Sequence, residues 1–340
     1  MARWNGRPAG LTIHVMLDRL PPDLAALAAS QSGALLGSQI TAALAPRGPQ
    51  RLVAGGVVKK LWHNGYAPVP VPRSMDGRDP GGPDTDAIRR LPWPDPHVRL
   101  AAAALTLRYP VIACSNTAAQ VHGFDLTGDE RTHVLAVQDF ASHLDGVVKH
   151  RIHPVRPTPV IAGCRVTDAA ETAVRIAARA RRPEHILAGL DAAMRFAGVD
   201  VDDFRAVADD LRIRGIRLVR EVLPYADHRA ESPGESWLRW VCVEAGFPPP
   251  TPQVWVTAGP GRQYRVDLGW DGLKVACEYD GVEFHTGAAL TRDRRKYNDL
   301  RDLGWLAHGV TSSMIWDHRP TLVRQVGAML SIRGAESASR

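Results

Sequence analysis

Three acidic residues on two adjacent predicted strands are the part of this sequence best suited to chemistry. Residues 264–281 have the pattern of two β-strands joined by the two-residue turn Asp271-Gly272, a strong hairpin signal. Because side chains alternate across a strand, Asp267, Glu278 and Asp280 are predicted to share one face. Asp267 and Glu278 are then diagonal neighbours, roughly 7–8 Å apart at the backbone. Carboxylates at that spacing can converge on one hard cation.

The other face of this hairpin is predicted to be core, and it carries Val266, Leu268, Val275, Cys277 and Tyr279. Like charges repel, so a positive charge is expected among the three acids. Two alternatives follow from the residues. A divalent metal supplies that charge, or Arg265 does, as a cross-strand ion pair with Glu278, which this register places opposite it.

The order of these residues resembles the PD-(D/E)XK nuclease superfamily, in its branch of very-short-patch-repair endonucleases. The resemblance covers about residues 232–330 and rests on Asp267, Glu278-Tyr279-Asp280-Gly281, His285, residues 292–300 and Leu303-Gly304-Trp305. It implies a restriction-endonuclease-like α/β domain in which Asp267 and Glu278 bind Mg²⁺ or Mn²⁺ and Asp280 and His285 act in catalysis. Two departures bear on cleavage rather than fold: Asp280 replaces the motif lysine, and residues 306–310 lack the usual arginine.

Two helices should flank this hairpin. Ser232-Pro233-Gly234-Glu235 predicts a helix start, since Ser-x-x-Glu is a capping box and proline suits the first turn. The resemblance also implies that Glu235 completes the acidic cluster, and both roles are compatible. A second helix, about residues 290–303, ends at Gly304. Its basic residues are predicted to contact phosphates, although a solvated face is the alternative; they include Arg292, Arg295 and Lys296.

Composition indicates an ordinary globular chain of 340 residues with a basic balance, a net charge of +6 and a pI of about 9.4. Residues 1–75 contain eight basic and two acidic residues, so the excess of positive charge in this segment alone equals the net charge of the whole chain. The four cysteines are widely spaced, which argues against a zinc site or a disulfide framework. No signal peptide or membrane span is evident, so a cytoplasmic protein is expected.

The N-terminal block has the pattern of a winged helix-turn-helix. Helices are predicted over residues 23–30, 37–44 and 49–54, followed by strands 57–63 and 66–69 around a type I′ turn at Asn64-Gly65. The predicted DNA contacts, on the third helix and the wing, are Arg47, Arg51, Lys59 and Lys60. This block resembles the N-terminal domain of AbiEi-type antitoxins, especially from Leu52 to Ala67. The alternative is a winged helix that binds protein.

Four segments are expected along the chain. They are a winged helix-turn-helix at 1–72, a Pro/Gly-rich linker at 73–97, a mixed α+β AbiEi-like middle domain at 98–228 and the nuclease-like domain at 229–333. The middle assignment rests on its resemblance to AbiEi-like proteins at residues 115–123 and 166–172.

The sequence is compatible with two functions. The first is a magnesium- or manganese-dependent endonuclease that cleaves the phosphodiester bonds of double-stranded DNA. The second is a non-catalytic DNA-binding regulator, such as the antitoxin of a toxin–antitoxin or phage-defence system, with a cognate toxin as its partner and a homodimer as one expected state. No membrane partner is expected. Intact carboxylates favour the enzyme, and the missing motif lysine favours the regulator.

Overall fold

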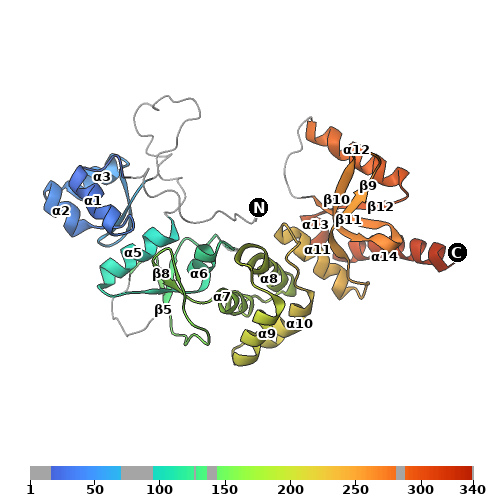
Figure 1. Cartoon of the computed structure of the whole chain (residues 1–340), viewed down its shortest axis with the longest axis horizontal. Helices are drawn as coiled ribbons and strands as arrows, with labels where there is room; N and C mark the ends of the chain where they lie inside the picture. The colour runs from blue at the N-terminus through green and yellow to red at the C-terminus, as the bar shows by residue number, and fades with distance from the viewer. Residues whose placement is uncertain (1–16, 70–94, 126–127, 136–143, 281–287, 339–340) are drawn as a thin grey trace. The chain divides into compact units, whose positions relative to one another are not determined.

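The protein has a mixed α/β architecture, shown in Figure 1 as a computed structural model that describes residues 17–69, 95–125, 128–135, 144–280 and 288–338. It divides into two compact units, with the boundary after Thr172. Each unit has its own buried apolar clusters. No helix in these ranges combines the length and apolar character needed to cross a bilayer.

The first unit begins with three short helices and a small sheet. The elements are α1 (Pro22–Ser30), β1 (Leu35–Leu36), α2 (Gly37–Leu44), α3 (Gly48–Ala54), β2 (Val58–Trp62) and β3 (Gly65–Pro68). The strands are antiparallel in the order β1-β3-β2. Leu24, Ile40 and Val58 pack together beneath the sheet. The three predicted helices and two strands are confirmed within about a residue at each end.

The turn between β2 and β3 differs from the predicted Asn64-Gly65 turn. Trp62 pairs with Gly65, so the turn residues are His63 and Asn64, and Asn64 alone has a left-handed backbone (φ 64°). A Cβ at position 65 would overlap the Trp62 indole. The glycine is therefore required by close packing against Trp62 rather than by the turn conformation.

A second sheet completes this unit. Its elements are α5 (Pro96–Leu107), β4 (Ile112–Ala113), α6 (Ser115–His122), β5 (Thr132–Leu135), β6 (Val147–His150), β7 (Val160–Ile161) and β8 (Cys164–Val166), with strand order β6-β5-β4-β8-β7. Helix α5 begins inside the predicted linker, because the Asp95 carboxylate accepts a hydrogen bond from the His97 N–H at 2.8 Å and caps it. The rest of the linker, 73–94, lies outside the described residues.

Helix α7 (Ala169–Ala177) spans the unit boundary, and α8 (Pro183–Ala197), α9 (Val201–Asp210) and α10 (Ile216–Val222) follow. Helix α8 packs against α11 (Pro233–Glu244) around a buried ion pair. Asp191 is fully buried and accepts hydrogen bonds from Ser236 (2.6 Å), Arg239 (2.5 Å) and the Asp227 N–H (2.7 Å). This network fixes α11, whose first turn carries Glu235, against the helical layer.

The C-terminal sheet has the strand order β12-β11-β10-β9. Its elements are β9 (Thr251–Thr257), β10 (Gln263–Trp270), β11 (Val275–Asp280), α12 (Ala288–Asp302), β12 (Leu306–Thr311), α13 (Ser312–Trp316) and α14 (Arg319–Ala338). Strands β11 and β12 are parallel and are joined through α12. Helices α11, α13 and α14 pack on one face through Leu238, Ile315 and Leu322, and α12 packs on the other through Leu300 (Figure 1).

The central hairpin turns more widely than Asp271-Gly272 alone. A 3-10 turn (Asp271–Leu273) and left-handed Lys274 form the loop, so Trp270 pairs with Val275 and Leu268 with Cys277. The predicted register is therefore wrong by two residues. An even shift preserves which face each side chain of β11 takes, so Cys277 is buried in the core as predicted.

Val266 is a second correction to the predicted core face. It packs with Ala276 and Leu300 beneath α12, whereas Leu268 packs with Cys277 on the opposite side. The alternation breaks at Asp267, whose carboxylate accepts the Tyr279 backbone N–H at 2.8 Å. The Asp267 side chain thus accepts the hydrogen bond of a backbone N–H on β11 that lies beyond the last paired residues of β10 and β11, Leu268 and Cys277.

We expect Asp191→Ala to destabilise the fold by about 3–5 kcal/mol, because it leaves the buried Arg239 guanidinium uncompensated. The double variant Asp191→Ala/Arg239→Met should recover much of that loss. Urea denaturation measures both, with Arg205→Ala in an exposed ion pair as the control. Equal stability of the single variant and wild type would contradict a structural role for this pair.

Candidate functional site

Three carboxylates meet where α11, β10 and β11 come together. Glu235 comes from the first turn of α11, Asp267 from the break in β10, and Glu278 from β11. Glu235 is buried, and the side chain of Glu278 is only 12 % exposed. The sequence analysis selected all three residues, and the structure brings them into electrostatic contact.

Glu235 caps α11 and also lies within the electrostatic influence of Asp267. Its N–H donates to the Ser232 hydroxyl at 3.2 Å, and its Oε1 accepts from that hydroxyl at 2.9 Å, so it helps to cap α11. Its Oε2 accepts from the Glu231 N–H at 2.9 Å and from the Gln253 amide at 2.7 Å. Gln253 has a left-handed backbone (φ 56°) and holds the carboxylate within the cluster, a role that the sequence did not suggest.

The cation beside these acids is Lys296 of α12. Its ammonium donates to Glu278 Oε2 at 2.5 Å and to the Arg265 carbonyl at 2.7 Å. Arg265 instead pairs with Glu231 at 2.5 Å, so the alternative of an Arg265–Glu278 ion pair is wrong. The register shift and the break at Asp267 explain this outcome. The sequence predicted that Lys296 contacts a DNA phosphate. No local sequence feature indicated that α12 would place its ammonium next to Glu278.

One lysine does not neutralise the cluster. Burial, and next the charge of Asp267, raise the pKa of Glu278 to about 7 although Lys296 lowers it. Burial, and next Asp267, also raise the pKa of Glu235 to about 7. Burial raises the pKa of Asp267 too, against the Tyr279 N–H and Lys296, which lower it. The folded protein therefore holds excess negative charge in a poorly solvated place.

Asp280 lies at the exposed end of β11. A Cβ on Gly309 of the neighbouring strand would collide with its Oδ2 and crowd the Tyr297 hydroxyl, so glycine allows Asp280 to approach β12. The charge of Asp280 contributes to the raised pKa of Asp267 and of Glu278. His285 and the side chain of Arg292 lie outside the described residues, and Arg295 is exposed on α12.

The donor set fits a hard divalent cation of the magnesium type. Glu278 Oε1 is buried and has no hydrogen-bond partner among the described atoms. Within the same part of the chain, no three His, Cys, Asp or Glu side chains are arranged to hold a metal. Mg²⁺ commonly uses one or two carboxylates, with water and substrate phosphate as the other ligands. Asp267 and Glu278 are therefore the two protein ligands that this site can offer.

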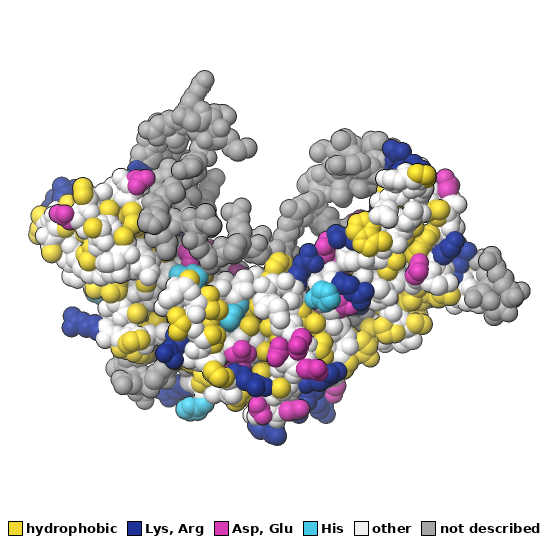
Figure 2. All heavy atoms as spheres, viewed as in Figure 1, with side chains coloured by type: hydrophobic (Ala, Val, Ile, Leu, Met, Phe, Trp, Pro, Cys, Tyr) yellow, Lys and Arg dark blue, Asp and Glu magenta, His cyan; other side chains and the backbone are white. Residues whose placement is uncertain are grey.

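The basic residues of the N-terminal block have different surroundings. Arg47 and Lys60 are exposed, and Lys59 is half-buried. Arg51 donates to the Leu44 carbonyl at 2.7 Å and so helps to end α2. On the face shown in Figure 2, acidic and basic side chains are intermixed over α9 and α10.

A histidine pair in the first unit was not predicted. His133 Nδ1 lies 2.8 Å from His150 Nε2, and His133 Nε2 lies 3.1 Å from Asp129 Oδ2. A hydrogen bond from Arg131 is the main cause of a pKa of Asp129 well below its usual range. These residues come from β5, β6 and the segment before β5, so only the parallel pairing of the two strands reveals the pair.

Comparison with known proteins identifies relatives. No protein-family model matches the chain. An uncharacterised protein from each of two strains of Mycobacterium tuberculosis is 38 % identical to it over 216 residues. The aligned region covers 62 % of this chain and 78 % of the mycobacterial protein.

In metal-free buffer we expect stability to fall as the pH rises from about 4.5 to about 7. Glu235 and Glu278 have folded-state pKa values of about 7, against an ordinary value of about 4.3, so the unfolded chain releases these protons first. The slope should reach about 1 kcal/mol per pH unit for each carboxyl.

Glu235→Gln should flatten this dependence and stabilise the protein at pH 8, because a neutral amide replaces an ionised buried group. Urea denaturation between pH 5 and 8 measures the effect, and Asp302→Asn, at an exposed position of α12, is the control. A wild-type stability that does not change over this range would contradict the raised pKa values.

Proposed function

This chain belongs to the same family as the mycobacterial proteins, and we propose that it acts on DNA through a metal-dependent phosphodiesterase site in its C-terminal sheet. The observation that carries the proposal is the cluster of Glu235, Asp267 and Glu278 beside Lys296, in which Glu278 Oε1 has no hydrogen-bond partner among the described residues. A fold gains no stability from excess buried charge, so a functional role accounts for the cluster better than a structural one.

Asp267 and Glu278 would hold Mg²⁺ or Mn²⁺. When bound, the ion lowers the pKa of coordinated water and neutralises charge on the scissile phosphate. Lys296 reaches Glu278 from α12 and supplies the ammonium that the Asp280 position lacks, so it can stabilise negative charge on a phosphate oxygen. Glu235, with its pKa near 7, is suited to accept a proton from the attacking water. His285 and Asp280 remain proposed catalytic neighbours.

The N-terminal block is the proposed DNA-targeting element. Three short helices followed by a β-hairpin support a winged helix-turn-helix, in which α3 enters the major groove and the β2–β3 wing reaches adjacent phosphates. Arg47 and Lys60 are exposed on these elements, and Lys59 is next to Lys60 on β2. Arg51 is the weaker candidate because it already bonds the Leu44 carbonyl. The resemblance to AbiEi-type antitoxins supports the same assignment.

A regulator is the second candidate function. Lys296 already occupies one oxygen of Glu278, and the described residues contain no three-ligand metal group. Both facts agree with a nuclease fold that clamps DNA or dimerises without cleaving it. This candidate would act as a DNA-binding antitoxin or transcriptional regulator, with a cognate toxin as its partner.

Wild-type protein with Mg²⁺ or Mn²⁺ is expected to nick supercoiled plasmid. Asp267→Asn and Glu278→Gln should each lower the rate by at least about a hundredfold, because each removes a charged metal ligand. Lys296→Met should also slow cleavage, and Lys296→Arg should recover part of it. Gel analysis of nicked plasmid over time, with Asp302→Asn as the control, measures these rates.

Tight DNA binding without nicking, over several DNA sequences and both metals, would instead support the regulator. Calorimetry separates the alternatives further. Magnesium binding that Asp267→Asn abolishes supports the metal site, and the absence of binding to wild type contradicts it.

Lys59→Gln/Lys60→Gln should weaken binding to duplex DNA about equally for every sequence and reduce the salt slope by about one unit for each lost phosphate contact. Fluorescence anisotropy at several salt concentrations measures both quantities. Arg217→Gln removes a charge from a side chain that is 92 % exposed on α10 and should leave both unchanged. An unaltered slope in the double variant would exclude β2 from the DNA contact.

A further inference from the structure

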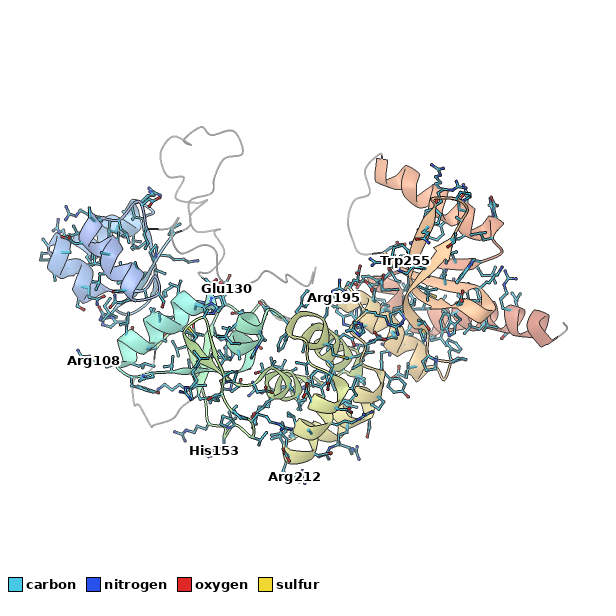
Figure 3. The ribbon with its side chains drawn as sticks, in the orientation of Figure 1. Arg108, Glu130, His153, Arg195, Arg212 and Trp255 are labelled. Atoms are coloured by element: carbon cyan, nitrogen blue, oxygen red, sulfur yellow. The ribbon has the colours of Figure 1, made fainter. Side chains whose placement is uncertain are left out.

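One large aromatic side chain is exposed beside the carboxylate cluster. Trp255 on β9 is 61 % exposed, whereas tryptophans 62, 270 and 305 are buried. Strand β9 is the edge of the C-terminal sheet, and Figure 3 labels Trp255 at that edge. An indole on an exposed edge strand leaves a ring face accessible to a ligand.

Trp255 has an ordered cationic partner. The Arg265 guanidinium lies over its ring, 5.6 Å from the centroid, and pairs with Glu231 at 2.5 Å. Glu231 also accepts from Arg195 of α8 at 3.0 Å. Glu231 therefore pairs with two arginines next to the indole, Arg265 and Arg195. A flat ring beside arginine side chains suits a ligand that combines aromatic faces with phosphate groups.

This surface joins the carboxylate cluster directly. The Glu231 N–H and the Gln253 side chain both donate to Glu235 Oε2. Gln253 is two residues from Trp255 on β9, a step of roughly 7 Å along a strand. On β10, the Arg265 carbonyl accepts from Lys296, which holds Glu278. A DNA strand that placed one phosphate at the carboxylates would therefore bring its next nucleotide close to Trp255.

We infer that Trp255, with Arg265 and Arg195, forms a stacking site for an unpaired base of the strand on which the carboxylate site acts. The inference rests on the proposed function and gives its substrate class: single-stranded or locally unpaired DNA. In a duplex the base faces are stacked on one another and only their edges are accessible in the grooves. An indole can contact a base face only where pairing has opened, whereas the arginines hold the neighbouring phosphates.

The test compares three 12-nucleotide probes: a thymine-bearing single strand, an abasic strand of the same length, and a duplex. Fluorescence anisotropy with the full chain in Ca²⁺ measures binding without requiring cleavage. Wild type should bind the thymine strand about tenfold more tightly than the abasic one, since the indole adds stacking to phosphate attraction. Trp255→Ala should bind both strands equally, and Trp255→Phe should retain most of the difference.

Ile332→Ala is the matched control, because it removes an apolar side chain that is 53 % exposed on α14 of the same unit. Equal binding of the thymine and abasic strands by wild type would overturn the inference, as would a Trp255→Ala variant with unchanged preference. Because the N-terminal block is itself proposed to bind duplex DNA, the duplex probe is compared only between wild type and Trp255→Ala, and a loss of duplex binding as large as the loss for the thymine strand would overturn the inference too. Plasmid nicking is scored separately, so a protein can stack bases and not cleave, or cleave and not stack.

Discussion

The C-terminal unit is organised around one electrostatic constraint: Glu235, Asp267 and Glu278 share a poorly solvated place with a single nearby lysine. Burial, and next the negative charge of Asp267, raises the pKa of Glu235 and Glu278 to about 7. The surrounding structure partly compensates. Lys296 donates a hydrogen bond to Glu278. Glu235 accepts hydrogen bonds from Gln253 and from the Glu231 N–H, and Asp267 accepts one from the Tyr279 N–H. The remaining charge is what a cation would balance.

The sheet deforms to make this arrangement possible. Strands β10 and β11 pair from Leu268 to Trp270, and at Asp267 a side chain takes over a hydrogen bond. The same break places Val266 beneath α12 and Leu268 beneath α11. Local irregularity of this kind commonly accompanies functional sites, because side chains must then point where a regular pleat would not send them. Apolar layers pack on both faces of the sheet at this break.

The two units have different physical resources for binding nucleic acid. Part of the basic excess of the N-terminal block lies on α3 and β2: Arg51 is on α3, and Lys59 and Lys60 are on β2. Positive charge attracts phosphates whatever the base sequence. The C-terminal unit instead offers an indole, two arginines and buried carboxylates. Attraction of phosphates by basic residues and chemistry at the carboxylates are thus properties of different units. For this reason both proposed functions, a regulator and a nuclease, are compatible with this architecture.

The sequence by itself determined the three helices and the hairpin of the N-terminal block, helices α11 and α12, and strands β10 and β11, because periodicity, caps and turn residues act over a few positions. It also selected Glu235, Asp267 and Glu278, but it did not predict β9, which carries Gln253 and Trp255. It missed the register of the hairpin, since Asp271-Gly272 resembles a tight turn whereas packing selects a wider loop. Only the tertiary structure decided that Lys296, rather than Arg265, is the cation at Glu278. That choice depends on how α12 crosses the sheet, and local sequence carries no record of contacts between residues 18 positions apart.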